Sequence, residues 1–298
     1  MRLVFLLGAV LLGLAQAQLT YPVEQFAKAL EVRAAGSSWA YGSARVQVQS
    51  LGKRLYKVSY QGPAGDPGRA GEVLAAALGN PQIRQAFADY VKANAGSLKG
   101  RGPVSVKVAD GFDFRLELAA NLSFALAPLE RHDFGSDRYL LGTKGPVIRV
   151  FSDFECPFCR RFAFEVMPEL VRAYVRKGQA RVSYRHFPLV EIHPRATQAA
   201  QGSECAAQQG KFLLYHDLLF VRGLEVRERA EELGLDLRRF ERCLADSATL
   251  QVVEEERRQA LRLGLQGTPT VFVGPFQLPN AFDLEAYGRY LEMARALR

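Results

Sequence analysis

The stretch from residue 147 to residue 161 reads VIRVFSDFECPFCRR, and it decides how the second half of the chain folds. It begins with a run of branched and aromatic residues, which is typical of a buried strand. Cys156-Pro157-Phe158-Cys159 follows soon after, and Pro157 fits the first turn of a helix, where its missing N–H costs nothing. We therefore expect a strand that runs into a helix with the two cysteines at its start.

The position of these cysteines predicts redox chemistry. Unpaired amide donors and the helix dipole stabilise a thiolate at a helix N-terminus, so Cys156 is the expected nucleophile. Cys159 lies one helical turn further on, where its thiol can attack a mixed disulfide on Cys156 and release the substrate. Glu155 is a candidate for tuning the pKa of Cys156, with a solvated surface carboxylate as the alternative.

Two other uses of a C-x-x-C pair have to be weighed. A zinc site would need further ligands such as Cys205, Cys243 or a histidine, but these two cysteines are isolated in the sequence, which disfavours zinc. A purely structural bridge between Cys156 and Cys159 would close too small a loop to stabilise much. Redox chemistry without a metal or cofactor is the preferred interpretation.

Residues 1–17 have the three parts of a secretory signal peptide, with a positive start, an apolar run and small residues at Ala15 and Ala17. We expect cleavage after Ala17; an uncleaved signal anchor is the alternative, although the apolar run is short for a hydrocarbon core of ~30 Å. No later stretch predicts a membrane span. The expected location is therefore the periplasm or the outside of the cell.

An oxidising compartment also bears on the other two cysteines. Cys205 and Cys243 both fall in predicted helices, and we expect a structural disulfide between them. Two separate buried thiols are the alternative, because free cysteine behaves as a small core residue.

The length of 298 residues suits two domains. Residues 18–130 show helical spacing and alternating strands twice over, with a Gly52-Lys53 turn in the first hairpin and Asp110-Gly111 in the second. This α+β domain contains no cysteine or histidine, and its preferred interpretation is a folding or association module. Residues 131–146 are the expected linker, and residues 147–298 the expected second domain.

The formal net charge of +8 comes from 39 Lys and Arg against 31 Asp and Glu. The arginine-rich stretches alternate with acidic residues, which is typical of solvated, ion-paired helices and not of a basic surface with stacking aromatics. Nucleic acid is therefore not an expected partner.

Four segments of the second half, in order, resemble the DsbA-like branch of the thioredoxin superfamily. They are FSDFE (151–155) before the two cysteines, RHFPL (185–189), CAAQQGKF (205–212) with YHD (215–217), and GTPT (267–270). The resemblance runs from about residue 140 to the C-terminus. It implies an α/β thioredoxin domain, with a helical insertion at about residues 190–264, that exchanges disulfides with protein thiols and with an unidentified redox partner.

The resemblance also implies a substrate groove. Pro269 would be a cis-proline beside the dithiol, and Thr268 would offer backbone groups to an extended peptide, with Pro157 and Phe158 on the other side. An ordinary turn is the alternative for these residues.

Two departures from the familiar periplasmic oxidase leave the direction of the reaction open. Phe158 stands where that oxidase has a histidine, so a hydrogen bond to the thiolate is lost. Thr268 resembles the isomerase and reductase relatives, some of which dimerise through an N-terminal domain. The alternatives are thus an isomerase or reductase that forms a homodimer through residues 18–130, and a non-enzymatic protein-binding or chaperone module.

Overall fold

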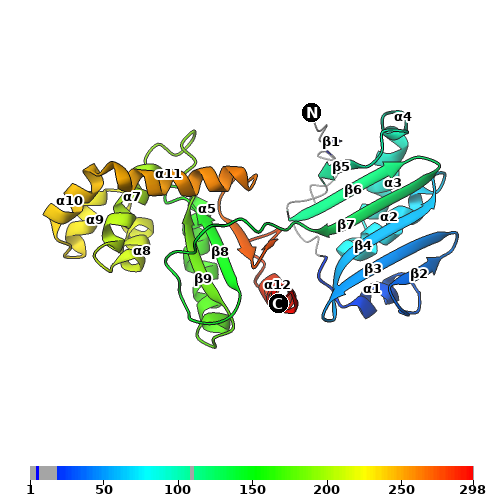
Figure 1. The fold of residues 1–298 in the computed structure, drawn as a ribbon, viewed down its shortest axis with the longest axis horizontal. Coiled ribbons are helices and arrows are strands. Elements are labelled where there is room, and N and C mark those ends of the chain that lie inside the picture. Colours follow the sequence, from blue (N-terminus) through cyan, green and yellow to red (C-terminus); the bar gives the residue numbers. More distant parts are fainter. Residues whose placement is uncertain (1–4, 7–18, 108–110, 298) are drawn as a thin grey trace. The chain divides into compact units, whose positions relative to one another are not determined.

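The computed structural model describes residues 5–6, 19–107 and 111–297 (Figure 1). The chain divides into two compact units, one made of residues 1–130 with residues 275–298 and the other of residues 131–274. The expected cleavage site after Ala17 lies outside the described residues, as does Asp110 of the second predicted turn.

The first unit is built on a seven-stranded sheet in the order β1-β5-β6-β7-β4-β3-β2. Its strands are β1 (Phe5–Leu6), β2 (Ser38–Tyr41), β3 (Ala44–Leu51), β4 (Arg54–Pro63), β5 (Val104–Lys107), β6 (Phe112–Leu118) and β7 (Asn121–Pro128). Strand β1 is parallel to β5, and the other neighbours are antiparallel. Both predicted hairpins, β3–β4 and β5–β6, therefore lie in one sheet.

Helices cover one face of this sheet, as Figure 1 shows for α2 and α3. The helices are α1 (Val23–Ala29), α2 (Pro67–Leu78), α3 (Ile83–Ala93) and α4 (Ala95–Leu98). Helix α2 ends at Gly79, whose φ of 65° is left-handed, while the N–H of Asn80 donates to the Ala75 carbonyl at 3.0 Å. Glycine adopts this conformation without a steric penalty and so ends the helix.

The centre of the first unit is aromatic. The ring of Phe124 on β7 stacks on Tyr60 at a centroid distance of 5.4 Å and meets the edge of Phe87 on α3 at 6.0 Å. We did not predict β7, although Leu122, Phe124 and Leu126 alternate with exposed or half-buried residues, which is the usual signal of a half-buried strand.

The C-terminal residues 275–298 group with the first unit, which differs from the predicted second domain of residues 147–298. They form β11 (Phe276–Gln277) and α12 (Leu284–Ala296). The N–H of Gln277 donates to the carbonyl of Leu129 at 3.0 Å, and Arg54 Nε pairs with Glu292 Oε2 at 2.6 Å. Contacts of this kind between distant parts of the chain cannot be inferred from local periodicity.

In the second unit, strands lie in the order β10-β8-β9, with β9 parallel and β10 antiparallel to β8. The strands are β8 (Val147–Ser152), β9 (Arg181–His186) and β10 (Thr270–Val273). The predicted helical insertion lies between β9 and β10 and consists of α7 (Ala196–Ala207), α8 (Phe212–Arg222), α9 (Val226–Glu232), α10 (Leu237–Ala245) and α11 (Ser247–Arg262). The expected α/β class with a helical insertion is confirmed.

One irregular helix connects β8 to β9. It runs through α5 (Pro157–Arg161), the π-helical η2 (Phe162–Val166), α6 (Met167–Leu170) and the π-helical η3 (Val171–Val175). Pro168 lies in the first turn of α6 and lacks an N–H, so it cannot continue the regular hydrogen-bond ladder. Wide π turns on both sides of Pro168 accommodate this interruption.

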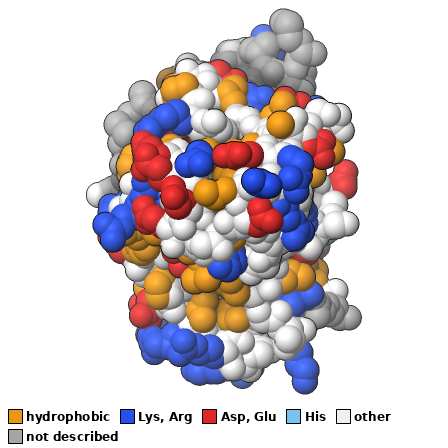
Figure 2. All heavy atoms as spheres, turned by 90° about the vertical axis from the view of Figure 1, so that its left-hand side faces the viewer, with side chains coloured by type: hydrophobic (Ala, Val, Ile, Leu, Met, Phe, Trp, Pro, Cys, Tyr) orange, Lys and Arg blue, Asp and Glu red, His pale blue; other side chains and the backbone are white. Residues whose placement is uncertain are grey.

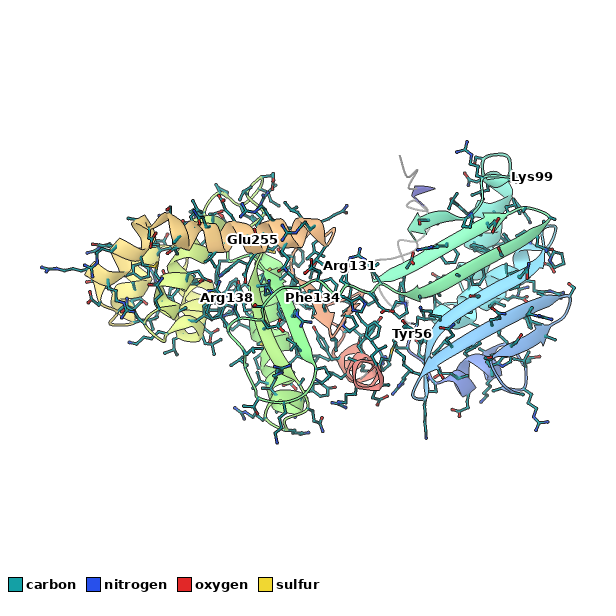
Figure 3. The ribbon with its side chains drawn as sticks, in the orientation of Figure 1. Tyr56, Lys99, Arg131, Phe134, Arg138 and Glu255 are labelled. Atoms are coloured by element: carbon teal, nitrogen blue, oxygen red, sulfur yellow. A yellow bond between two sulfur atoms is a disulfide. The ribbon has the colours of Figure 1, made fainter. Side chains whose placement is uncertain are left out.

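Residues 131–146, the expected linker, belong to the second unit. Leu141 forms a bridge with Val182 on β9, and Arg149 Nε on β8 pairs with Asp137 Oδ1 at 2.7 Å. Arg138 Nη2 reaches Glu204 Oε2 on α7 at 2.6 Å, and Figure 3 labels Phe134 and Arg138 on this segment. The polar residues that suggest a linker therefore include side chains that pair with the sheet and with the insertion.

We predict that Phe124→Ala lowers the free energy of unfolding of the first unit by about 3–5 kcal/mol, because it leaves a cavity among packed rings. Trp39 is the chain's one tryptophan and is buried in the same unit, so its fluorescence during urea unfolding reports on this unit. Phe164→Ala, at a ring that is 41% exposed in the second unit, is the matched control. An unchanged urea midpoint for Phe124→Ala would show that this packing is not needed.

Candidate active site

Cys156 is the residue immediately before α5, and its backbone is extended, with φ −75° and ψ 121°. The N–H of Arg160 donates to the Cys156 carbonyl at 3.1 Å, so Cys156 is the N-cap of the helix. Cys156 and Cys159 are both free thiols and are only 4% and 1% exposed. The sulfur of Cys156 donates to the Thr268 carbonyl at 3.4 Å, and the Thr268–Pro269 peptide bond is cis. The fold thus brings together the two segments that carry the predicted chemistry.

The two sulfur atoms differ strongly in acidity. A hydrogen bond from Cys159 is the largest influence on the pKa of Cys156, which falls to about 6, and burial opposes this shift. The side chain of Thr268 and the backbone N–H groups of Cys159 and Phe158 also lower the pKa. Burial raises the pKa of Cys159 well above its usual value, and contact with the Cys156 sulfur adds to this rise. At neutral pH one buried thiolate therefore lies beside one buried thiol.

The surroundings of the dithiol are partly open. Pro157 and Phe158 are exposed, with 60% of Phe158 accessible, whereas Thr268 and Pro269 are half-buried. A peptide that approaches Cys156 would meet an apolar ring on one side and backbone groups on the other. The role of these residues as a substrate groove stays a prediction.

Glu155 is tied to the insertion. Its Oε2 accepts a hydrogen bond from the backbone N–H of Arg195 at 2.8 Å, and its Oε1 lies 3.5 Å from the Arg195 guanidinium. Arg195 also pairs with Glu225 at 3.3 Å. These contacts link Glu155 to the insertion, and its role in tuning the pKa of Cys156 stays a prediction.

Asp153 is a residue of the site that we did not single out from the sequence. Its side chain is completely buried, and Oδ2 lies 2.9 Å from Nδ1 of His193. Its backbone N–H donates to the Cys159 sulfur at 3.4 Å. The position of an acidic residue directly after a buried strand, three residues before the nucleophile, is the signal that could have identified it.

An aromatic group joins the active-site loop to the insertion. Phe154, between β8 and Cys156, stacks on Tyr184 at 5.5 Å and contacts Phe220 on α8 at 5.3 Å. His216 on α8 meets the Tyr184 ring edge-on at 4.9 Å. In addition, Arg160 Nε on α5 donates to the Phe220 carbonyl near the end of α8 at 2.8 Å. The loop that carries Cys156 is therefore held against a helix of the insertion.

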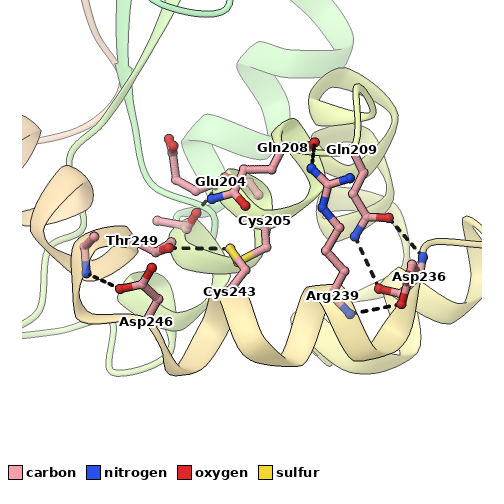
Figure 4. Close-up of a disulfide and its surroundings, with 12 residues drawn as sticks. Glu204, Cys205, Gln208, Gln209, Asp236, Arg239, Cys243, Asp246 and Thr249 are labelled. Carbon is pink, nitrogen blue, oxygen red and sulfur yellow. Dashed lines mark hydrogen bonds between the residues drawn. A yellow bond between two sulfur atoms is a disulfide. The ribbon is translucent and has the colours of Figure 1, made fainter.

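The structure joins Cys205 on α7 to Cys243 on α10 in a disulfide, with Cα atoms 5.6 Å apart (Figure 4). The same two helices are linked by Arg239 Nη2, which donates to the Gln208 carbonyl at 2.7 Å. This is the pairing that we expected. Because the two sulfurs are bonded to each other, they are not available as further ligands for a metal at Cys156 and Cys159.

Charges on the insertion are mixed. Figure 2 shows basic and acidic side chains interspersed over the face that it displays. Arg227 pairs with Glu231 and Glu241, and Arg262 pairs with Glu255 at 2.7 Å. Among the described residues, no group of three or more His, Cys, Asp or Glu could hold a metal ion. The expectation that nucleic acid is not a partner stays a prediction.

Comparisons with known proteins concern the second half of the chain. The thioredoxin family matches residues 142–293. A thioredoxin-like oxidoreductase from Silicibacter pomeroyi is 28% identical over 52% of this chain and 91% of that protein, with a TM-score of 0.47. The α-DsbA1 protein of Wolbachia pipientis is 20% identical over 55% of this chain and 94% of that protein, with a TM-score of 0.48.

One curated relative carries the name of an antiporter. The Na⁺/H⁺ antiporter NhaA 3 of Salinispora tropica is 37% identical over 141 residues, which cover 46% of this chain. The chain spans about a fifth (21%) of the length of that protein. Within the described part of the chain, we find no helix with the length and apolar composition that a membrane crossing requires.

We expect the reduced protein to react with iodoacetamide at Cys156 with a midpoint near pH 6. The lowered pKa keeps this sulfur ionised at pH 7, and the reactive thiolate is lost as the pH falls through about 6. Alkylation rates measured across this range, with mass spectrometry to locate the label, provide the check. A midpoint at the usual value of a free thiol, or preferential labelling of Cys159, would contradict the assignment.

We also expect the Cys205→Ala, Cys243→Ala double variant to lose about 4 kcal/mol of unfolding free energy, from the entropy of a closed loop of 38 residues. Chemical denaturation of the non-reduced protein, monitored by hydrogen exchange within α7 and α10, measures this loss. In the native unreduced protein neither Cys205 nor Cys243 is expected to be alkylated. Labelling of both would remove the basis for the prediction.

Proposed function

This chain belongs to the thioredoxin family, and from that premise we propose that it is an extracytoplasmic thiol:disulfide oxidoreductase that acts on protein substrates through Cys156 and Cys159. The observation that carries the proposal is the pair of free cysteines at the start of α5, with the Cys156 sulfur 3.4 Å from the carbonyl of Thr268, the residue before a cis-proline. The Cys156 thiolate at the start of α5 is the attacking group, and Cys159, one turn later, stays protonated until the second step.

The first step in the reducing direction is an attack of the Cys156 thiolate on a substrate disulfide. A bond forms between the Cys156 sulfur and one substrate sulfur, while the substrate S–S bond breaks. The second substrate sulfur leaves as a thiolate and takes a proton from solvent. The product is a mixed disulfide between Cys156 and the substrate.

Cys159 completes the exchange. Its thiol loses a proton and attacks the Cys156 sulfur, which releases the remaining substrate sulfur as a thiolate that can accept that proton. The Cys156–Cys159 disulfide has then formed, the protein has lost two electrons, and the substrate has gained them. The raised pKa of Cys159 keeps this sulfur protonated until the mixed disulfide is in place.

The oxidising direction is the same sequence in reverse, and the acidity of Cys156 favours it. A thiolate that is stabilised in the reduced protein makes the disulfide form a better oxidant. We therefore propose that the Cys156–Cys159 disulfide is transferred to substrate thiols and is regenerated by a separate redox partner.

Two features support an extracytoplasmic location. Residues 1–17 have the pattern of a secretory signal peptide, and the Cys205–Cys243 disulfide is of a kind that persists in oxidising compartments.

Reduction of insulin by dithiothreitol tests the proposal. We expect the full-length protein to accelerate precipitation of the insulin B chain, and Cys156→Ser to fall to the uncatalysed rate, because the attacking thiolate is gone. Cys159→Ser is expected to accumulate mixed disulfides with insulin, which mass spectrometry detects.

The matched control is the Cys205→Ala, Cys243→Ala variant, which also lacks two sulfurs but keeps the dithiol. At a temperature where this variant is folded, we expect it to retain most of the activity, because Cys156 and Cys159 are unchanged. If Cys156→Ser performed as well as the unaltered protein, the catalytic assignment would be wrong, and a protein-binding role would replace it.

A further inference from the structure

Asp153 connects the two cysteines through its backbone. Its N–H donates to the Cys159 sulfur at 3.4 Å, and its carbonyl accepts the N–H of Cys156 at 3.2 Å. The residue therefore contacts the sulfur of one cysteine and the main chain of the other. Any shift of residue 153 changes the spacing within the dithiol.

The side chain of Asp153 fixes this backbone in place. Its Oδ1 accepts the N–H of Glu155 at 2.7 Å, and its Oδ2 accepts the N–H of Leu189 at 2.8 Å and lies 2.9 Å from Nδ1 of His193. The carboxylate is completely buried, so water does not substitute for these partners. A buried carboxylate with such a set of donors is costly to disturb.

We propose that Asp153 is the positioning residue of the dithiol: its carboxylate locks the loop after β8, and the locked loop holds the Cys159 sulfur beside the Cys156 sulfur. This inference rests on the proposed dithiol chemistry. Asp153 does not react with substrate, and it acts on Cys156 through Cys159. His193 lies in the loop after β9, is 15% exposed at its side chain, and contacts the Asp153 carboxylate from that loop.

Asn at position 153 has nearly the same shape but presents an N–H₂ group where the carboxylate has an oxygen. Whichever way the amide is turned, its N–H₂ faces the N–H of Glu155 or of Leu189, and that donor loses its acceptor. The loop then loosens, and the hydrogen bond from Cys159 to Cys156 weakens. Because this bond is the largest influence that lowers the pKa of Cys156, the pKa rises.

A purely electrostatic role predicts the opposite sign. Asp153→Asn removes a negative charge near the thiolate, and less repulsion would lower the pKa of Cys156. The direction of the change therefore separates positioning from a charge effect.

The experiment titrates the reduced full-length protein by thiolate absorbance at 240 nm and by iodoacetamide labelling. For Asp153→Asn we expect the pKa of Cys156 to rise to between about 6.5 and 7, which lowers the thiolate fraction at pH 6 about two- to five-fold. His193→Ala removes one donor, keeps the carboxylate and is expected to move the pKa in the same direction by a smaller amount. This second variant keeps the test valid if Asp153→Asn does not fold.

A double-mutant cycle with Cys159→Ala tests whether Asp153 acts on Cys156 through Cys159. We expect Asp153→Asn to have no further effect on the Cys156 titration in the Cys159→Ala background, because the sulfur through which it acts is absent. A shift of equal size in both backgrounds would overturn the proposal.

Asp137→Asn is the matched control, because Asp137 is a partly buried carboxylate of the same unit that pairs with Arg149 and does not contact the dithiol loop. It is expected to leave the Cys156 titration unchanged. An unchanged or lowered Cys156 pKa in folded Asp153→Asn and His193→Ala would overturn the proposal. The titration does not depend on turnover, so failure of insulin reduction and failure of this inference can be told apart.

Discussion

A thiolate held almost out of contact with water is the constraint on which the second unit depends. Cys156 is only 4% exposed, so its charge has to be stabilised by hydrogen-bond donors supplied by the protein. The start of α5 provides backbone donors, and Cys159 provides a thiol. The sheet brings the remaining contact, because Thr270 on β10 lies opposite Phe151 on β8. In this register the loop after β8 meets the segment before β10, where the side chain of Thr268 also lowers the pKa of Cys156, while the Thr268 carbonyl accepts a hydrogen bond only from the protonated thiol.

The helical insertion also restricts the loop that leads to Cys156. Phe154 lies between Tyr184 on β9 and Phe220 on α8, so the loop that leads to Cys156 has apolar contacts with both. Arg160 adds a hydrogen bond from α5 to the last turn of α8. These contacts restrict the loop on its apolar side, while the carboxylate of Asp153 restricts it on its polar side. Order in the loop lets one sulfur keep its hydrogen bond to the other.

Local patterns in the sequence were enough to predict β8, the start of α5 at Pro157, and the helices between residues 196 and 262, because each rests on short-range periodicity or on a turn residue. The pairing of Cys205 with Cys243 followed from the compartment. Residues such as Asp153 and His193 were not recognised, because they are 40 positions apart and their roles come from a tertiary contact. The grouping of α12 with the first unit was missed for the same reason, because the Arg54–Glu292 pair joins positions 238 residues apart.

Buried charge explains why the insertion belongs to the core of the second unit. Strand β9 places Arg185 and His186 in the interior, where unpaired charges or polar groups would be costly. The insertion supplies their acidic partners: Glu256 on α11 lies 3.2 Å from Arg185 Nε, and Glu204 on α7 lies 2.9 Å from His186 Nε2. Burial alone would raise the pKa of Glu204, but His186, Tyr139 and Arg138 bring it to about 2, so it remains ionised. Since Glu204 directly precedes Cys205, the disulfide anchors the helix that carries the partner of His186 on β9. The disulfide, the buried pairs and the active-site loop are thus parts of one connected arrangement, in which the insertion stabilises the strand beside the dithiol.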